Sequence, residues 1–353
     1  MTARRRVAVI AGDGIGPEVV GEALKVLAAV ESKFHPGVTV EPLPFGADHF
    51  LKTGITIPAA EMQRLGRDFD AIFVGALGDP RVPGNEHARD ILLGMRFQLD
   101  LYVNERPARL FHERLTPLKG KTPKDIDLVI FRENTEGLYV SVGGIFKQGT
   151  PDEITIAEEL NTRKGVERII RHAFAWAKEH GKSRVTMADK ANAIAAHSLW
   201  RRVFEEVGAE YKDIKRDVRY VDAMAMDLIR TPEQFQVIVT GNLFGDILSD
   251  LASMLAGGLG IAPSANRHPG RVAMFEPVHG SAPPLAGKDL ANPMAAVLTL
   301  GMMLETLGAG DAAAAVQSAV VHAIATGIGT EDVGGTLGTR AVGDWLANEI
   351  ATA

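Results

Sequence analysis

Short apolar runs alternate along the chain with segments in which apolar residues recur every three or four positions. The first run, Val7–Ile10, stops at a glycine-rich turn, and the apolar residues from Val19 to Leu27 then recur with helical spacing. A similar helical pattern covers residues 165–178. Further apolar runs of strand length predict buried strands at 71–74, 128–131, 185–187 and 237–240. Strands that alternate with helices predict a layered α/β fold.

Residues 139–159 depart from this alternation. Gly143 and Gly144, followed by the alternating Ile154 and Ile156, predict a hairpin or arm outside the main sheet, and we expect it near a subunit interface. No internal repeat or low-complexity linker separates two halves of the chain. A second domain is therefore expected to be inserted into the first rather than appended to it.

Composition and charge narrow the classes of function. The chain has 353 residues, of which 46% are hydrophobic and 23% charged, as in an ordinary globular protein. The net charge of −6 gives no general attraction to nucleic acid or anionic lipid, and no apolar stretch reaches the length of a membrane span. We therefore expect a cytoplasmic enzyme that has neither nucleic-acid nor membrane partners. Any anionic ligand must be held by local arginines.

The chain contains no cysteine, which excludes disulfides, iron–sulfur clusters, zinc thiolate sites and thiol nucleophiles. Any metal must be bound through oxygen or imidazole. Two acidic residues fit this requirement, because Asp246 and Asp250 are spaced i,i+4 and so share one side of a predicted helix. Paired carboxylates suit Mg²⁺ or Mn²⁺. Taken alone, the pair is better explained as a solvated acidic face.

The first loop, Gly12–Glu18, has the sequence GDGIGPE. A dinucleotide-binding G-x-G-x-x-G motif would need glycine at position 17, where the chain has Pro17. The residues alone favour a tight strand-to-helix turn, with Pro17 at the first helical position and Glu18 in the first turn.

Several other polar residues stand in apolar or turn-like surroundings. Arg96, Arg106 and Arg132 suit a dicarboxylate if they converge, although each one alone is more simply a structural salt bridge. Lys190 and Tyr139 are candidate proton carriers, with a surface lysine and a core tyrosine as the simpler explanations.

In this order along the chain, these segments resemble the β-decarboxylating dehydrogenase family, which includes 3-isopropylmalate, isocitrate, homoisocitrate and tartrate/D-malate dehydrogenases. The resemblance covers nearly the whole chain. Its most specific motifs are Gly12–Glu18 (GDGIGPE), Arg132–Gly137 (RENTEG), Asp189–Asn192 (DKAN), Gly241–Asp250 (GNLFGDILSD), Glu276–Pro283 (EPVHGSAP) and Ala291–Pro293.

The resemblance implies an isocitrate/isopropylmalate dehydrogenase-like α/β fold, which is not a Rossmann fold. A large cofactor-binding domain would comprise residues 1–104 and 259–353, and a smaller α/β substrate and dimerisation domain would comprise residues 105–258. Two chains would form a homodimer whose active sites are shared between the chains. The substrate would be a small 2-hydroxy dicarboxylate, oxidised and decarboxylated with hydride transfer to NAD.

Motif matching assigns the site residues. The resemblance implies that the substrate carboxylates are held by Arg96, Arg106 and Arg132. It implies that Mg²⁺ or Mn²⁺ is bound by Asp246 and Asp250 together with Asp222 of the partner subunit, which is also a substrate-binding position. Lys190 of the partner subunit would be the general base, and Tyr139 would be the acid that protonates the enolate.

The resemblance also implies where the dinucleotide binds. The family positions that surround it fall on Ile15, His279, Gly280, Ser281, Ala282 and Asn292. Asp332 matches an acidic position of the NAD-using members, and the Lys-Tyr pair of NADP-type isocitrate dehydrogenases is absent. The chain departs from the NAD pattern at Pro284, where the family usually has Asp. NAD is the expected cofactor.

The segment before Arg96 discriminates substrates within the family. Isocitrate enzymes have Ser and Asn where this chain has Asp90 and Leu92, and homoisocitrate enzymes have arginine where it has Leu93. Leu92 and Leu93 offer an apolar pocket, so the expected substrate is 3-isopropylmalate, in leucine biosynthesis. Residues 141–144 (SVGG) and 261–266 (IAPSAN) instead look like the tartrate/D-malate branch, which is the main alternative.

Two non-catalytic alternatives are a regulatory subunit of a related hetero-oligomer and a binding protein on the same scaffold. Regulatory subunits lose metal-binding or proton-transfer residues. The chain retains all five, which favours an active homo-oligomer: Tyr139, Lys190, Asp222, Asp246 and Asp250.

Overall fold

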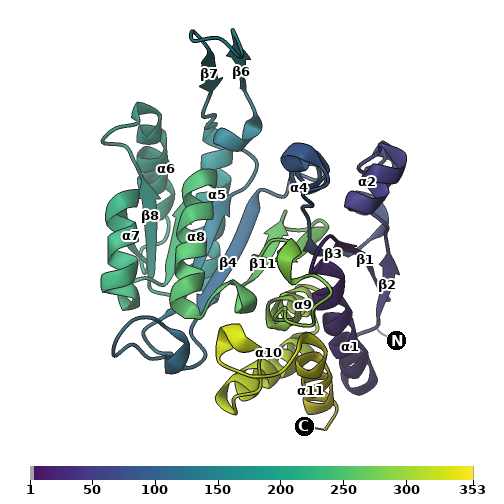
Figure 1. Ribbon diagram of the computed structural model, residues 1–353. Coiled ribbons are helices and arrows are strands. Elements are labelled where there is room, and N and C mark those ends of the chain that lie inside the picture. Colours follow the sequence, from purple (N-terminus) through teal and green to yellow (C-terminus); the bar gives the residue numbers. More distant parts are fainter. Residues whose placement is uncertain (1–3, 353) are drawn as a thin grey trace. The chain divides into compact units, whose positions relative to one another are not determined.

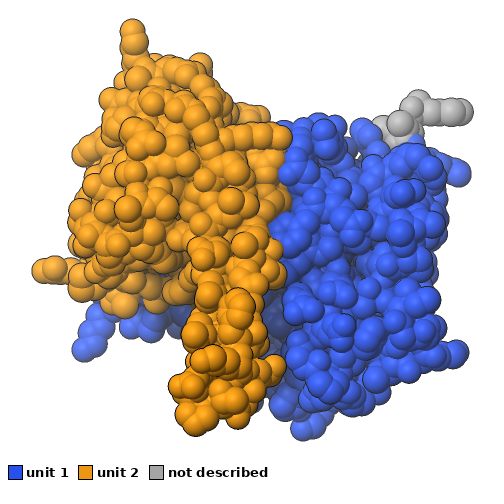
Figure 2. Space-filling model, turned by 90° about the horizontal axis from the view of Figure 1, so that it is seen from above, with its two compact units in different colours: residues 1–101, 106–126, 253–353 blue, residues 102–105, 127–252 orange. Residues whose placement is uncertain are grey.

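The computed structural model describes residues 4–352, and the chain divides into two compact units (Figures 1 and 2). Unit 1 contains the residues up to Leu101, the segment Arg106–Ile126 and the residues from Ser253 onward. Unit 2 contains Tyr102–Glu105 and Asp127–Ala252. Unit 2 is thus inserted into the sequence of unit 1.

Residues 106–126 lie in unit 1, whereas the sequence analysis placed them in the inserted domain. Their own contacts explain the difference. Phe111 and Leu115 pack against the hydrophobic core of unit 1. The guanidinium of Arg114 donates hydrogen bonds to the backbone carbonyls of Val333 and Ile324 in the same unit. Residues 106–126 therefore pack against the C-terminal part of unit 1.

Unit 1 is an α/β unit assembled from both ends of the chain. Its strands lie in the order β2-β1-β3-β12-β11, in which β1 is parallel to β2 and β3, β3 is parallel to β12, and β12 is antiparallel to β11. The elements of unit 1 are β1 (Arg5–Gly12), α1 (Gly16–Phe34), β2 (Val38–Pro42), α2 (Ala47–Thr53), α3 (Ala59–Asp68), β3 (Ala71–Ala76), α4 (Glu86–Gln98), β11 (Pro263–Arg267), β12 (Ala273–Pro277), α9 (Met294–Thr306), α10 (Gly310–Ala325) and α11 (Thr339–Thr352).

The largest core of unit 1 joins residues that are far apart in the sequence. Val19, Val26 and Val30 of α1 belong to the same buried cluster as Leu346 and Ile350 of α11. Helix α9 is apolar on almost every side, and ten of its thirteen residues are buried, so it forms the centre of this core. Lys25 of α1 also binds Asp344 of α11, at 2.8 Å between Nζ and Oδ1.

Unit 2 contains four strands in the order β5-β10-β8-β9, joined by three parallel pairings, and a separate two-stranded ribbon. Its elements are β5 (Asp127–Glu133), β6 (Gly143–Phe146), β7 (Ile154–Ala157), α5 (Arg163–Glu179), β8 (Arg184–Asp189), α6 (Ser198–Gly208), β9 (Lys215–Tyr220), α7 (Val221–Arg230) and β10 (Val237–Thr240). Two further elements, β4 (Val103–Arg109) and α8 (Asn242–Ala256), each have residues in both units.

The predicted arm is the antiparallel ribbon of β6 and β7, which stands clear of the parallel strands of its unit (Figure 1). Its apolar side chains are largely exposed, and Phe146 retains 55% of its accessible surface. We call residues 143–160, which contain β6 and β7, the arm. Within residues 4–352, none of the helices combines the length and the apolar character needed to cross a bilayer.

Candidate active site

The parallel strands of unit 2 bring most of the predicted charged residues to one edge of the sheet. Register pairs Thr240 at the end of β10 with Arg132 of β5 and with Ala188 of β8. Asp189 at the end of β8 pairs with Tyr220 at the end of β9. Lys190 follows β8 directly, and Asp222 follows β9. Carboxyl ends of parallel strands are where α/β proteins bind ligands, so this edge is the candidate site of unit 2.

One cluster at this edge joins Arg132, Tyr139 and Asp246. The Arg132 guanidinium donates to Asp246 Oδ1, and Arg132 Nε donates to Asn242 Oδ1 at 2.9 Å. The Tyr139 hydroxyl donates to Asp246 Oδ2 at 2.9 Å. Arg132 is buried although it carries a charge, and such a group needs partners of this kind. The structure therefore holds an arginine, a phenol and a carboxylate in contact.

A second cluster at the same edge pairs Lys190 with Asp222. Lys190 Nζ donates to Asp222 Oδ2 at 2.6 Å, and both residues belong to the same chain. The hydrogen bond from Lys190 holds the pKa of the Asp222 carboxyl below its ordinary value. The two residues that the family resemblance assigns to the partner's contribution are thus neighbours within one subunit.

Asp246 and Asp250 lie one turn apart on α8, as predicted, and Asp250 is exposed. Ile247 on the same helix is 57% exposed. In the described part of the chain, no three His, Cys, Asp or Glu side chains gather in a way that would hold a metal. The oxygen donors of this pair are of the kind that suits Mg²⁺ or Mn²⁺.

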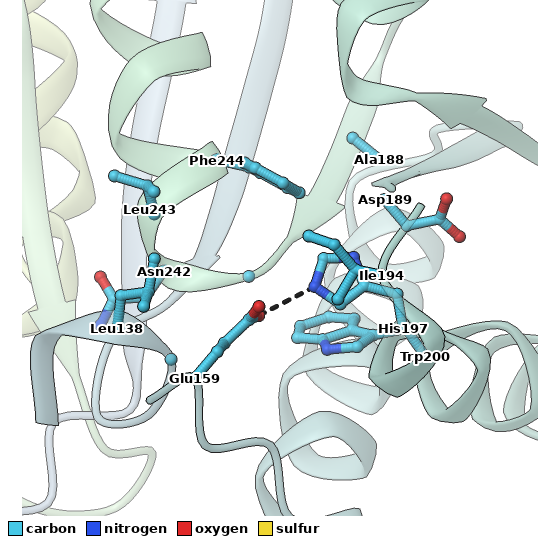
Figure 3. A pocket seen from close by; sticks show the side chains of 12 residues that line it. Leu138, Glu159, Ala188, Asp189, Ile194, His197, Trp200, Asn242, Leu243 and Phe244 are labelled. Carbon is cyan, nitrogen blue, oxygen red and sulfur yellow. Dashed lines mark hydrogen bonds and ion pairs between the residues drawn. The ribbon is translucent and has the colours of Figure 1, made fainter. Parts of the chain in front are cut away.

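Further residues support the loop that carries Lys190. Asp189 is buried and accepts two hydrogen bonds from Arg201, at 2.6 and 3.0 Å. The backbone N–H of Lys190 donates to His197 Nδ1 at 3.0 Å. His197 in turn contacts Glu159, and that hydrogen bond lowers the pKa of the Glu159 carboxyl. Asp189, His197 and Glu159 line a pocket in unit 2 (Figure 3).

In unit 1, the predicted cofactor residues gather at the carboxyl ends of β1, β3 and β12. Gly12 of β1 pairs with Ala76 of β3. The backbone N–H of Ile15 donates to the carbonyl of Ser281 at 2.8 Å, so the first loop and the motif after β12 are bonded directly. Gly14 has a φ of +56°, and a Cβ there would lie 2.0 Å from Ser281 O. Only glycine allows this approach.

The structure begins α1 at Gly16, which makes Pro17 the second helical residue rather than the first. Ile15 occupies the N-cap position and no side chain caps the helix. Glu18 lies in the first turn as predicted and accepts a hydrogen bond from the backbone of Gly287. The turn is therefore closed by backbone contacts, as the simpler explanation of the motif requires.

His279 has the properties of a neutral ligand-binding imidazole. Burial lowers the pKa of its ring, and the ring's Nε2 atom is buried with no hydrogen-bond partner among the described residues. Next to it, Gly280 is exposed, and a Cβ there would meet nothing within 4 Å. Ala282 then adopts a φ of +38° at the start of the short helix Pro283–Leu285. A ring nitrogen without a hydrogen-bond partner, next to a glycine with free space around it, fits a dinucleotide-binding site.

Asn292 and Asp332 are hydrogen-bonded to each other in unit 1. Asn292 Nδ2 donates to Asp332 Oδ2 at 3.0 Å, and the Thr330 hydroxyl donates to Asp332 Oδ1 at 2.5 Å. Asn292 Oδ1 also accepts from the backbone of Met294 at the start of α9. The Asp332 carboxylate is thus fixed in place near the start of the most buried helix of the unit.

Helix α4 carries Leu92 and Leu93, which were predicted to form an apolar substrate pocket, and Arg96, which was predicted to hold a substrate carboxylate. Leu92 and Leu93 are partly exposed, and Arg96 is buried one turn later. Arg96 donates to Glu276 Oε1 at 2.9 Å, and its buried Nε has no hydrogen-bond partner among the described residues. An unfilled arginine donor beside two leucines suits a carboxylate that carries an alkyl group. Arg106, on β4, is buried as well.

Sequence reasoning missed several supporting residues. Glu276 was quoted only as part of a motif, although a charge inside the apolar strand Ala273–Pro277 already indicated a buried partner. Arg201, His197 and Glu159 carried no feature that distinguishes them from surface residues. They support the backbone around Lys190 only in the folded chain, so no spacing between residues in the sequence identifies them.

Comparison with known proteins agrees with this geometry. The model of the family described as isocitrate/isopropylmalate dehydrogenase matches residues 6–346. A protein named 3-isopropylmalate dehydrogenase from Thermobifida fusca is 45% identical over 357 residues, covering 99% of each chain. One of the same name from Frankia casuarinae is 45% identical and covers 91% of this chain and 92% of its own. The crystal structure of isocitrate dehydrogenase from Methylococcus capsulatus superposes with a TM-score of 0.89 at 37% identity, over 99% of this chain and 100% of that one.

Proposed function

Because the chain belongs to the isocitrate/isopropylmalate dehydrogenase family, we propose that it catalyses the oxidative decarboxylation of 3-isopropylmalate with NAD. The observation that carries this proposal is the pair Leu92 and Leu93 on α4, one turn before a buried arginine with an unfilled donor. The names of the relatives from Thermobifida fusca and Frankia casuarinae support the same substrate. A place in leucine biosynthesis and a cytoplasmic location follow from this proposal.

Arginine side chains bind the substrate in this proposal. Arg96, Arg106 and Arg132 are all buried, so their guanidinium groups are in surroundings where a paired carboxylate is bound strongly. Leu92 and Leu93 contact the isopropyl group, and each buried methylene contributes about 0.8 kcal/mol. A third carboxylate at this position, as in isocitrate, would lose its hydration against leucine without a compensating hydrogen bond.

Lys190 removes the proton from the C2 hydroxyl as hydride leaves C2, and a 2-oxo acid results. Its hydrogen bond to Asp222 keeps the ammonium or amine group in one position. After the β-carboxylate leaves as CO₂, Tyr139 donates the proton that converts the enolate to the product. The Tyr139 hydroxyl is already aligned by Asp246.

Two bound groups complete the site. Asp246, Asp250 and Asp222 of the partner subunit would hold Mg²⁺ or Mn²⁺, and the loops at Ile15 and His279–Ala282 with Asn292 and Asp332 would hold NAD. When bound, the cation supplies a Lewis acid to the C2 oxygen and NAD supplies the hydride acceptor.

The active form in this proposal is a homodimer. Helices α7 and α8 expose large apolar side chains, namely Met226 and Ile229 on α7 and Ile247 and Met254 on α8. The arm exposes more of them. Exposed apolar patches of this size are typical of subunit interfaces. A dimer also supplies the third carboxylate that the Asp246 and Asp250 pair lacks.

The test is a kinetic panel of 3-isopropylmalate, D-malate, tartrate, isocitrate and homoisocitrate, each with NAD⁺ and NADP⁺. We expect the highest kcat/KM with 3-isopropylmalate and NAD⁺, followed by D-malate. The double variant Leu92→Ser/Leu93→Ala should lose activity on 3-isopropylmalate far more than on D-malate, which has no alkyl group to bury. A wild-type kcat/KM that is higher for D-malate or tartrate would replace the proposed substrate by that of the tartrate/D-malate branch.

A further inference from the structure

We infer that His197 is a positioning residue for the Lys190 backbone, and that Glu159 of the arm keeps the His197 ring in the tautomer that this role requires. The inference rests on the proposed function for its kinetic consequence. Its structural part concerns hydrogen bonds that exist whether or not a substrate is known.

His197 contacts three elements that the mechanism uses. Its Nδ1 accepts the backbone N–H of Lys190 at 3.0 Å. Its Nε2 lies 2.8 Å from Glu159 Oε1. The ring also meets Phe244 of α8 edge to face, with 5.5 Å between the ring centroids. Figure 3 shows the imidazole at the centre of this arrangement, with the Trp200 ring beside it.

The tautomer follows from the partners of the two ring nitrogens. A backbone N–H can only donate, so Nδ1 must be unprotonated to accept from Lys190. Nε2 must then carry the hydrogen, which it donates to the Glu159 carboxylate. If Glu159 were absent, the Lys190 N–H would be the one remaining contact among the described residues that favours Nε2–H over Nδ1–H. In a ring protonated at Nδ1, the Nδ1–H and the Lys190 N–H would point at each other, and neither group could accept a hydrogen bond.

Burial strengthens these hydrogen bonds. His197 is 4% exposed and the Glu159 side chain is 25% exposed, so solvent competes little for the ring nitrogens. Lys190 itself lies in the turn between β8 and the helical segment Ala195–His197, where no strand pairing holds its backbone. The His197 contact therefore fixes the point from which the Lys190 side chain extends to Asp222.

The chain position of Glu159 extends this inference to the arm. Glu159 is the second residue after β7, and the neighbouring Leu160 is hydrogen-bonded to Gly137 of the motif that contains Arg132. A change in the arm's path would move Glu159, and with it the ring that supports the base. The arm is thereby connected to the general base through two side chains.

Two substitutions at His197 separate positioning from packing. His197→Asn places a carbonyl oxygen near the position of Nδ1, so it can still accept from Lys190. His197→Gln is closer to histidine in size but places its amide near Nε2, so the Lys190 contact is lost. We expect His197→Gln to lower kcat about 10- to 100-fold with little change in either KM, since small displacements of catalytic groups have effects of this size. His197→Asn should retain kcat within about threefold of wild type.

A packing role predicts the reverse order, with glutamine tolerated better than asparagine, and that result would overturn the inference. Glu159→Ala should lower kcat in the same direction as His197→Gln but less. Its matched control is Glu158→Ala, because the backbone N–H of Glu158 donates to the carbonyl of Val142, whereas its side chain has no hydrogen bond to any residue within 4–352. Urea unfolding of every variant identifies any loss that reflects stability alone.

A second measurement does not require activity. In protein labelled with ¹⁵N-histidine, the resonance pair missing from the His197→Asn spectrum should show unprotonated Nδ1 and protonated Nε2 at neutral pH, and Glu159→Ala should alter it. A protonated Nδ1 would contradict the inference. Wild-type protein that turns over no 2-hydroxy dicarboxylate would instead overturn the proposed function, and the tautomer would still be decided.

Discussion

The two units present opposite kinds of chemistry at the ends of their parallel strands. In unit 1, the predicted cofactor residues meet mainly through backbone, as when the Ile15 N–H donates to the Ser281 carbonyl. In unit 2, charged side chains contact each other, as Arg132 does with Asp246 and Lys190 with Asp222. One region is shaped by close backbone approach, and the other by paired charges.

This difference predicts how each region fails. Replacement of a charged residue in unit 2 leaves a partner charge without compensation at the site, so activity should fall while the fold persists. Replacement of a glycine in unit 1 forces the backbone itself to move, so stability and cofactor affinity should fall together. The following predictions test that contrast, from the largest expected effect to the smallest.

Loss of the divalent cation should have the largest effect. Asp246→Asn removes a charge that we propose binds the cation, and it alters the contacts to Arg132 and Tyr139, so we expect almost no turnover. Treatment of the wild type with EDTA should abolish activity in the same way, and added Mn²⁺ or Mg²⁺ should restore it. Full turnover after exhaustive chelation would exclude the metal role.

Lys190→Met should fold and dimerise but lose about 10²- to 10⁴-fold in kcat, the usual contribution of a general base. Mixing it with Asp246→Asn under conditions of subunit exchange tests the shared site. Mixed dimers combine an intact Lys190 with the partner's intact Asp246, so activity should recover to about a quarter of wild type at random exchange. If mixing restores nothing, the assignment of Lys190 and Asp246 to different subunits of one site is wrong.

Gly14→Ala should destabilise the protein by about 2–4 kcal/mol and raise KM for NAD⁺, because the new Cβ would overlap Ser281 O. Gly54→Ala is the matched control, since Gly54 also has a positive φ, +71°, but open space around its Cβ position. It should cost only about 1 kcal/mol for the backbone conformation. Urea unfolding measures both, and equal losses would show that the approach to Ser281 has no special importance.

Pro284→Asp should have the smallest effect, a rise of about 3- to 10-fold in the preference for NAD⁺ over NADP⁺, because a carboxylate accepts hydrogen bonds from ribose and repels a 2′-phosphate. Pro284→Ala controls for the loss of the proline ring in the short helix Pro283–Leu285. The ratio of kcat/KM values for the two cofactors measures the change. A preference that falls, or a wild type that already favours NADP⁺, would contradict the assignment.

The strands that could be predicted from the sequence are those buried on both faces. The apolar runs at 71–74 and 237–240 became β3 and β10, in which every residue is buried. Strand β9, Lys215–Tyr220, was missed because it lies last in the strand order and carries charged, partly exposed side chains. Strand β4 was missed because its buried residues include Asn104, Glu105 and Arg106, which do not form an apolar run.

The residues of the candidate site also divide into those that the sequence predicted and those that it missed. The spacing of Asp246 and Asp250 indicated a shared helix face, and the structure contains it. The family motifs named Lys190 but said nothing of His197, because the contact runs from a ring nitrogen to a backbone N–H that only the turn after β8 brings within reach. Residues that act on substrate carry their chemistry in the side chain. Residues that hold other residues are recognised only once the backbone is known.

The insertion of unit 2 into unit 1 has a consequence for the order of folding during synthesis. The parallel strands and helices of unit 2 are complete once the chain reaches Ala252, so this unit can fold while residues 253–353 are still being made. Helix α1 emerges first, yet its buried face packs with α9 and α11. The ribosome thus releases the first segment of unit 1 long before its partners exist, and the nascent chain must keep Val19, Val26 and Val30 from aggregating until the last helix arrives.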